Sequence, residues 1–511
     1  MKSRREQELE LEVKRLKKEN EELKKTVKIQ QKQLKQQNEL LEDVEKSNKI
    51  KENRELKRKN ELLKDDLNKA NEIIKEKDNE IKLLVARIQK DSTNSSKPSS
   101  TDSIYKKPIH VVSSRKKGGK NGGQWNHKGH TFSKEDVEKL KNEENVVYEL
   151  KEVGIKSKNY KSKYLVDIKI LTTITEYRYY EKEDGTYDIP VNMLPNVQYG
   201  PISKALMCYL GSEMMAPLNK IRSFFKQITK NVFKLSEGTI VNTQKALDTK
   251  LTPIVAEIKA RLINAGVLHV DETGVRINGV LNWLHTCCTK DLAYYEVNKK
   301  RGEEAIDAIG ILSYFVNILV HDHWKSYYKK THITHAECNA HILRYLKGIL
   351  EIGQQKDVEE LIKLFVEMNE VKKQAIENGC NKLDDKDIEM YSAKYSQILR
   401  NWRKELNKRM SKAKNTDYFK DELNLLNRLE EYKENHLLFL KNFEVPFDNN
   451  LAERNLRTIK TKVKVAGGFK TEGGAKTFAK IRSFFVTCKS RTSNIIDATI
   501  KIFEGEGYEF A

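Results

Sequence analysis

The stretch from about residue 5 to residue 90 constrains the fold more than any other part of the sequence, because it contains neither proline nor glycine. Its apolar and amide side chains recur in alternating steps of four and three, first from Leu9 to Val44 and then from Leu56 to Ile88. Heptads sustained over this length predict a coiled coil rather than a single solvated helix. A lone charged helix and a disordered arm are the alternatives.

Three asparagines fall at the a positions of these heptads: Asn20, Asn48 and Asn60. A buried asparagine at an a position favours a parallel two-stranded coiled coil. We therefore expect residues 1–90 to join the protein into a homodimer or a larger homo-oligomer.

The charge of the chain limits its partners. Its 511 residues include 95 Lys+Arg against 74 Asp+Glu, a formal net charge of +21. Nucleic acid is the commonest partner for such an excess, and an anionic membrane surface is the alternative. We find no apolar run of roughly 18 residues and no signal peptide. The six scattered cysteines form no disulfide framework, so a reducing, cytoplasmic location is expected.

Three segments precede the region that carries the chemistry. Residues 91–130 are rich in Ser and Gly and predict a basic linker arm that follows phosphates, with a plain flexible linker as the alternative. Residues 131–201 alternate apolar and polar side chains and predict a small β-rich domain. Residues 202–262 predict a helical region with helix-turn-helix-like spacing around Ser236, although two packed helices without a DNA role fit equally well. The candidate DNA contacts of the arm are Arg115, Lys116, Lys117, Lys120 and Lys128.

Two apolar strands then end in aspartates. Val267–Val270 runs into Asp271, and a later strand, Phe315–Val320, is followed by His321 and Asp322. Between them, Gly274 and the dipeptide Asn278–Gly279 are turn signals before a second strand through Leu284. Since ligands bind at the ends of strands in open α/β sheets, the two aspartates are expected at one edge.

A third acid opens a helix within the segment "PFDNNLAERNLRTIK". Asp448, Asn449 and Asn450 are good N-cap residues, and Gly467 with Gly468 would end the helix. One stripe is apolar: Ala452, Leu456, Ile459 and Val463. A neighbouring stripe begins with Glu453 and continues with basic residues toward the end of the helix. The candidate phosphate contacts on this helix are Arg454, Arg457, Lys460 and Lys464. An ordinary helix with an acid at its positive end and i,i+4 ion pairs is the alternative.

Three convergent carboxylates have a clear chemical use. Hard oxygen ligands bind Mg²⁺, with Mn²⁺ as an alternative, and leave positions for water and phosphate oxygens. Two such ions about 4 Å apart stabilise the attacking and leaving oxygens of an in-line phosphoryl displacement. Cations beside the glutamate would then lie where phosphates approach.

The residues around these acids match a family over most of the chain. The matching segments are "GGKNGGQWNHKGHTF", "YGPISKALMCYL", "KLSEGTIVN", "HVDETG", "HDHWKSY", "HAECNAHILR" and "FDNNLAERNLRTIK". With them the chain resembles the insertion sequence 66 family of bacterial DDE transposases.

The resemblance implies that Asp271, Asp322 and Glu453 form the catalytic, metal-binding DDE triad. It implies a ribonuclease-H-like α/β core built from residues 263–350 and 445–511. The long spacing between the second and third acids implies a helical insertion at residues 351–444. The family's cysteine-rich zinc segment is missing, since no cysteine precedes Cys208.

One further set of residues resembles a zinc site. His335, Cys338 and His341 follow each other in steps of three, which would place them near one face of a helix. A clear fourth ligand is lacking, although His332 is near. Helix packing and a phosphate contact are the alternatives.

The function that this resemblance implies is that of a bacterial, nucleoid-associated DNA transposase. It would bind double-stranded element ends and target DNA, cleave with Mg²⁺ and join the freed 3′-OH; accessory transposition proteins are further candidate partners. A catalytically inactive coiled-coil DNA-binding protein derived from a transposase is the first alternative, and a coiled-coil scaffold is the second. The presence of all three acids favours the active enzyme.

Overall fold

The computed structural model describes residues 4–45, 50–88, 90, 133–141, 143, 146–152, 161–189, 197–353, 355–413, 415–491 and 494–510. Two compact units emerge, one of residues 1–108, 200–217 and 241–511, and the other of residues 109–199 and 218–240. The predicted basic arm, with Arg115, Lys116, Lys117, Lys120 and Lys128, lies outside the described residues. No helix in the described ranges is long and apolar enough to cross a membrane.

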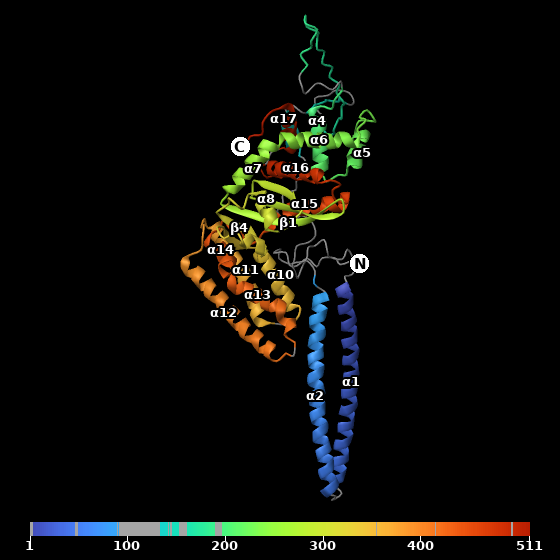
Figure 1. The fold of residues 1–511 in the computed structure, drawn as a ribbon, viewed down its shortest axis with the longest axis vertical. Coiled ribbons are helices and arrows are strands. Elements are labelled where there is room, and N and C mark those ends of the chain that lie inside the picture. The colour runs from blue at the N-terminus through green and yellow to red at the C-terminus, as the bar shows by residue number, and fades with distance from the viewer. Residues whose placement is uncertain are drawn as a thin grey trace. The chain divides into compact units, whose positions relative to one another are not determined.

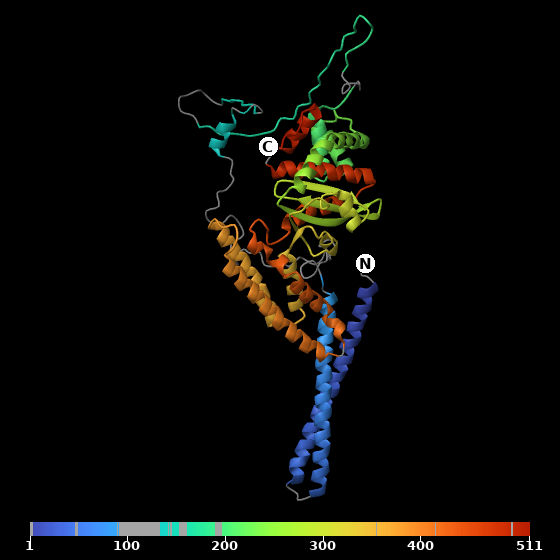
Figure 2. The same ribbon diagram turned by 60° about the vertical axis from the view of Figure 1, so that its left-hand side comes forward.

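Two long helices form the N-terminal part of the first unit. They are α1 (Arg4–Glu45) and α2 (Ile50–Ile88), which lie side by side in Figures 1 and 2. The pairing is antiparallel: Leu16 shares a buried cluster with Leu84, and Asn60 Nδ2 donates to Asn38 Oδ1 at 2.7 Å. The prediction of long heptad-bearing helices therefore agrees with the structure.

Two of the asparagines at the a positions, Asn20 and Asn60, have partners within the same chain, and Asn48 lies outside the described residues. Asn20 Nδ2 donates to Asp78 Oδ1 at 2.8 Å, and both Asn20 and Asn60 are buried. The expectation of a parallel dimer rested on these amides meeting their counterparts in a second chain. Their intrachain pairing removes that support, so dimerisation through residues 1–90 is left without a structural basis and is tested by the unfolding of that fragment.

A mixed five-stranded sheet organises the remainder of the first unit. The strand order is β3-β2-β1-β4-β5, in which β1, β2 and β3 are antiparallel neighbours and β4 and β5 run parallel to β1. The strands are β1 (Val267–Ile277), β2 (Val280–Cys288), β3 (Ala293–Asn298), β4 (Ile318–His321) and β5 (Thr334–Glu337). Asn278 and Gly279 have φ of 47° and 78°, which confirms the predicted hairpin turn. Gly274 was predicted to be a turn residue, but it lies inside β1 opposite Trp283.

Helices cover both faces of this sheet (Figure 1). Leu268 and Val270 of β1 pack in one core with α7, whereas Val275 and Ile277 pack in another core with α15. This alternation follows from the two-residue period of a strand. The helices outside the insertion are α4 (Pro201–Ser212), α6 (Glu237–Lys250), α7 (Thr252–Ile263), α8 (Glu303–Ile309), α9 (Lys325–Tyr328), α10 (Asn339–Leu350), α15 (Asn450–Ala466), α16 (Glu472–Ser490) and α17 (Ile495–Glu504).

The region predicted as a helical insertion forms a bundle with its own core. Trp402, Tyr395 and Phe365 are fully buried there, and Val320 of β4 and Ala336 of β5 belong to the same cluster. The insertion therefore packs directly against the sheet edge that carries Asp322. Its elements are α11 (Lys356–Glu377), α12 (Asp385–Ser411), the 3₁₀ helix η3 (Thr416–Phe419), α13 (Lys420–Glu431) and α14 (Lys433–Lys441).

The prediction of a β-rich domain at residues 131–201 is wrong for the residues described there. Residues 133–152 and 161–189, where described, contain the helix α3 (Lys134–Leu140) and no strand. The alternating side chains that suggested strands, such as Val166 and Ile168, are 63% and 83% exposed. Alternation alone does not stabilise a strand when no apolar layer covers its face.

The helices of the predicted helix-turn-helix are present. In the second unit, α5 (Leu218–Ile228) places Phe225 against Phe233, with ring centroids 5.8 Å apart. Ser236 Oγ accepts a hydrogen bond from Thr239 N at 3.0 Å, as expected of an N-cap. A role of these helices in binding DNA remains a prediction.

Candidate active site

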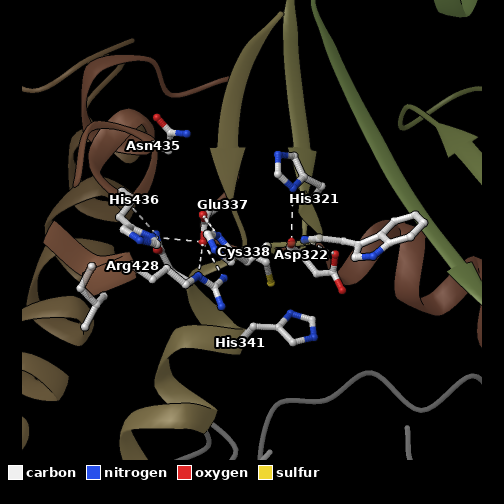
Figure 3. Close-up of polar contacts among 12 residues, drawn as sticks. His321, Asp322, Glu337, Cys338, His341, Arg428, Asn435 and His436 are labelled. Carbon is white, nitrogen blue, oxygen red and sulfur yellow. Dashed lines mark hydrogen bonds and ion pairs between the residues drawn. The ribbon is translucent and has the colours of Figure 1, made fainter. Parts of the chain in front are cut away.

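The two aspartates occupy equivalent positions on neighbouring parallel strands. His269 of β1 pairs with Val320 of β4. Asp271 and Asp322 each follow two residues after these paired positions. Side chains two residues apart on a strand share a face. Asp271 and Asp322 therefore project from the same face of the sheet as His269, at the point where β4 ends. Figure 3 shows Asp322 at the end of its strand.

Asn449 joins the start of α15 to this face. Its Nδ2 donates to Val270 O at 2.8 Å, and its Oδ1 lies 2.9 Å from His269 Nδ1. Its backbone N–H donates to Cys338 Sγ at 3.1 Å. Asn449 occupies the N-cap position as predicted, but its side chain makes no capping bond and instead fixes the first turn of α15, with Glu453, next to the strand that carries Asp271.

The helix α15 itself follows the prediction closely. Its apolar stripe is buried at Ala452, Leu456 and Ile459, and Gly467 ends it with φ of 72°. Glu453 is in the first turn, where its Oε1 accepts from Arg344 Nη2 at 3.2 Å.

The environment of the three acids raises the pKa of each of them. Burial raises the pKa of Asp271 well above its usual range, and the charges of Glu272, Asp322 and Glu453 add to the rise. Burial, with the charge of Glu272, raises the pKa of Asp322 to about 6. Burial also raises the pKa of Glu453, against the opposing effect of Arg344. Carboxylates crowded in this way are the donors that a divalent cation neutralises.

A fourth acid, Glu272, was not identified from the sequence. It is 9% exposed, forms an ion pair with Arg301 at 2.6 Å, and accepts a hydrogen bond from the Tyr327 hydroxyl. Arg301 in turn lies 4.8 Å from the Trp283 ring centroid and 4.3 Å from that of Trp324. The sequence offered one signal for Glu272, namely its position next to Asp271. Its partner Arg301 is close in space but distant in sequence, so their ion pair could not be predicted.

A buried ion cluster fixes the neighbouring strand end (Figure 3). Glu337, the last residue of β5, accepts from Arg428 Nε at 2.9 Å and also pairs with His323. Although burial disfavours its charged form, His436, His323 and Arg428 hold the pKa of Glu337 well below its usual range. Since Arg428 belongs to α13, the cluster links the helical insertion to the loop that contains Asp322.

The candidate phosphate contacts of α15 are mostly free of protein partners. Arg454, Arg457 and Lys464 are exposed and Lys460 is partly exposed. Within the described part of the chain, none of these four residues forms an ion pair. The charge of Arg457 does lower the pKa of Glu453, four residues before it, so the alternative of i,i+4 stabilisation keeps this one contribution.

The predicted zinc set does not assemble as expected. His335 lies in β5 and its Nδ1 is 3.0 Å from His321 Nε2, while His332 contacts Leu312 O. Cys338 and His341 instead meet Glu453, and one ligand atom from each lies within 4.8 Å of the others. Burial raises the pKa of the Cys338 thiol to about 12 and lowers the pKa of His341 to about 3.

A known protein family matches the region that contains the three acids. The family model described as Transposase IS66 family matches residues 196–477, which include all three acids. A comparison with curated proteins gave no significant match.

Proposed function

Since the chain belongs to the IS66 family of transposases, we propose that it cleaves DNA at the ends of a mobile element and joins the freed 3′-OH to target DNA. Asp271, Asp322 and Glu453 are the proposed catalytic residues. The strand order supports a ribonuclease-H-like core for residues 263–350 and 445–511.

One observation carries this proposal. Asp271 and Asp322 follow the paired positions His269 and Val320 on adjacent parallel strands, and Asn449 fixes the helix of Glu453 to the same strand. The charge of each partner raises the pKa of Asp271. The charges of the other two acids therefore both act on Asp271, although the three lie far apart in sequence.

These acids suit Mg²⁺, or Mn²⁺ in its place, because all three offer hard oxygen donors. When bound, such ions polarise the scissile phosphate and make water or a 3′-OH a better nucleophile. Asn449 and the Glu337–Arg428 pair hold the carboxylates in position. Arg344 forms an ion pair with Glu453 at 3.2 Å.

Basic side chains on α15 and in the arm would hold the DNA by its phosphates. Arg454, Arg457, Lys460 and Lys464 of α15 extend from the same helix as Glu453, so phosphates that they hold would lie near the acids. The arm cations Arg115, Lys116, Lys117, Lys120 and Lys128 would add phosphate contacts that depend strongly on salt and little on sequence. Double-stranded element ends and target DNA are the proposed partners.

The test is cleavage of labelled element-end DNA by the full chain with Mg²⁺ or Mn²⁺. Asp271→Asn, Asp322→Asn and Glu453→Gln are each expected to lower the cleavage rate at least a hundredfold while DNA binding is kept. Asp291→Asn, an exposed acid in the β2–β3 turn, is the matched control and should cleave normally. DNA binding without any cleavage by the wild-type protein would instead indicate an inactive derivative of a transposase.

A further inference from the structure

We propose that Cys338, His341 and Glu453 form a second metal site, one for a thiophilic divalent ion such as Zn²⁺. This site would use Glu453 in competition with Asp271 and Asp322. The binding itself does not depend on the proposed function, whereas its consequence for DNA cleavage rests on it.

The geometry brings together three side chains from two elements. Cys338 is the N-cap of α10, and His341 follows in the first turn of that helix; Figure 3 shows the two side chains near the end of β5. Residues three apart on a helix face the same side. Glu453 reaches them from α15, and a ligand atom from each lies within 4.8 Å of the other two.

His341 provides an independent indication that a ligand is missing. Its Nδ1 is buried and has no hydrogen-bond partner among the described residues. Glu453 Oε1 lies 3.5 Å from it, too far for a good hydrogen bond. A buried ring nitrogen without a partner costs free energy, which coordination to a metal ion would recover.

The donor set selects the kind of ion. A thiolate, an imidazole and a carboxylate are the ligands of zinc, and three of them leave a fourth position for water. Mg²⁺ prefers oxygen donors and would not favour the sulfur. Tetrahedral zinc ligands lie roughly 3.3–3.8 Å apart, so the three atoms need to approach by about 1 Å.

Asn449 supports the sulfur ligand. Its backbone N–H already donates to Cys338 Sγ at 3.1 Å, a contact that stabilises a thiolate bound to metal. On binding, the thiol proton of Cys338 passes to solvent and the metal takes its place. The neutral His341 ring contributes the lone pair of Nδ1, and no electron transfer is involved.

The consequence follows from the position of Glu453. A carboxylate held with Cys338 and His341 is not available to Asp271 and Asp322. Zn²⁺ at the second site would therefore suppress Mg²⁺-dependent cleavage, and occupancy of the two sites would be mutually exclusive.

Cobalt(II) is the probe for binding, because its complexes with a thiolate absorb in the near ultraviolet. We expect the full-length protein to bind one Co²⁺ with this band, and Zn²⁺ to displace it. Cys338→Ser and Cys338→Ala should abolish the band, and His341→Gln and Glu453→Gln should weaken binding at least tenfold. Cys380→Ser and His335→Gln are matched controls outside the site and should leave binding unchanged.

A Co²⁺ band that survives both Cys338 variants, in protein shown to be folded by circular dichroism, would overturn the second site. Cleavage is tested separately at saturating Mg²⁺. Zn²⁺ should inhibit the wild type at least tenfold more strongly than Cys338→Ser, and equal inhibition would overturn the competition. If the wild type cleaved no DNA at all, the proposed function would fail while the Co²⁺ result would still decide the site.

Discussion

Asn449 connects three segments that are distant in sequence. Its side chain bonds to Val270 O and His269, and its backbone N–H bonds to Cys338 Sγ. Because it is 1% exposed, the groups that it bonds are out of contact with bulk water. The side chain therefore controls where Glu453 lies with respect to Asp271.

Asn449→Ala should lower the free energy of unfolding by about 1–3 kcal/mol, the cost of leaving Val270 O and the His269 ring without partners. Urea denaturation measures this loss. Cleavage by the folded variant should fall further than its stability implies, since Glu453 loses its anchor. Asn450→Ala is the control, because that exposed side chain donates to the nearby Asp448 and to none of the groups that Asn449 joins. Equal effects of the two substitutions would contradict the role of Asn449.

Asp322 gives the metal-free protein a pH dependence with a definite sign. Its pKa is raised to about 6 in the folded chain, against about 3.9 when unfolded. Between these values the folded state binds more protons, so the free energy of unfolding should fall as pH rises from about 4 to above 6. Chemical denaturation in a chelating buffer measures it. The slope should be smaller in Asp322→Asn, and an unchanged slope would show that another group causes it.

The loop after α15 holds this helix to the β1–β2 hairpin. Phe469 N donates to Arg276 O at 2.9 Å, and Asn278 N donates to Phe469 O at 2.8 Å. Gly468 has φ of +105°, and an added Cβ would lie 2.6 Å from Arg276 O. Gly467 also has a positive φ, but an added Cβ there meets nothing within 4 Å.

The two glycines therefore form a matched pair of substitutions. Gly467→Ala should cost about 1–2 kcal/mol from its left-handed backbone alone. Gly468→Ala should cost clearly more, because the hairpin contact must also move. Thermal and urea unfolding of the two variants provide the comparison. A Gly468→Ala protein as stable as Gly467→Ala would show that the contact yields easily.

The N-terminal helices make a separate prediction. Since α1 and α2 bury their heptad residues against each other, a fragment of residues 1–90 should be helical, with an unfolding midpoint independent of its concentration. Circular dichroism across a hundredfold range of concentration tests this. A midpoint that rises with concentration would favour the homodimer that the a-position asparagines first suggested.

The elements were predictable where the local pattern was complete. The helix of residues 450–466, the turn at Asn278–Gly279 and the heptad helices each follow from caps, periodicity or turn residues. The partner of a heptad face was not predictable, because the a positions of α1 accept α2 as readily as a second chain. The strands expected between residues 161 and 189 failed because alternation does not reveal whether a covering layer exists.

At the scale of the whole molecule, the two aspartates could be located by their positions after apolar strands and Glu453 by its place at the start of a predicted helix, and the family resemblance joined the three. The ion pairs that surround these acids could not be predicted from the sequence. Glu337 and Arg428 form a buried pair across the sheet and the insertion, and Glu272 meets Arg301. Such pairs depend on tertiary packing and leave no periodic trace in the sequence. The grouping of His335 with Cys338 assumed that one helix carries both residues. His335 lies in the strand β5 instead.

The central claim is that Asp271, Asp322 and Glu453 act as one site for divalent metal. The most direct test is the unfolding midpoint of the full chain against Mg²⁺ or Mn²⁺ concentration. The wild type should gain about 2.7 kcal/mol at a hundredfold excess over the dissociation constant, as should Asp291→Asn. Asp271→Asn, Asp322→Asn and Glu453→Gln should lose most of this gain, and the two aspartate variants should be more stable than the wild type without metal, because repulsion is relieved. Variants that gain as much from metal as the wild type would contradict the claim.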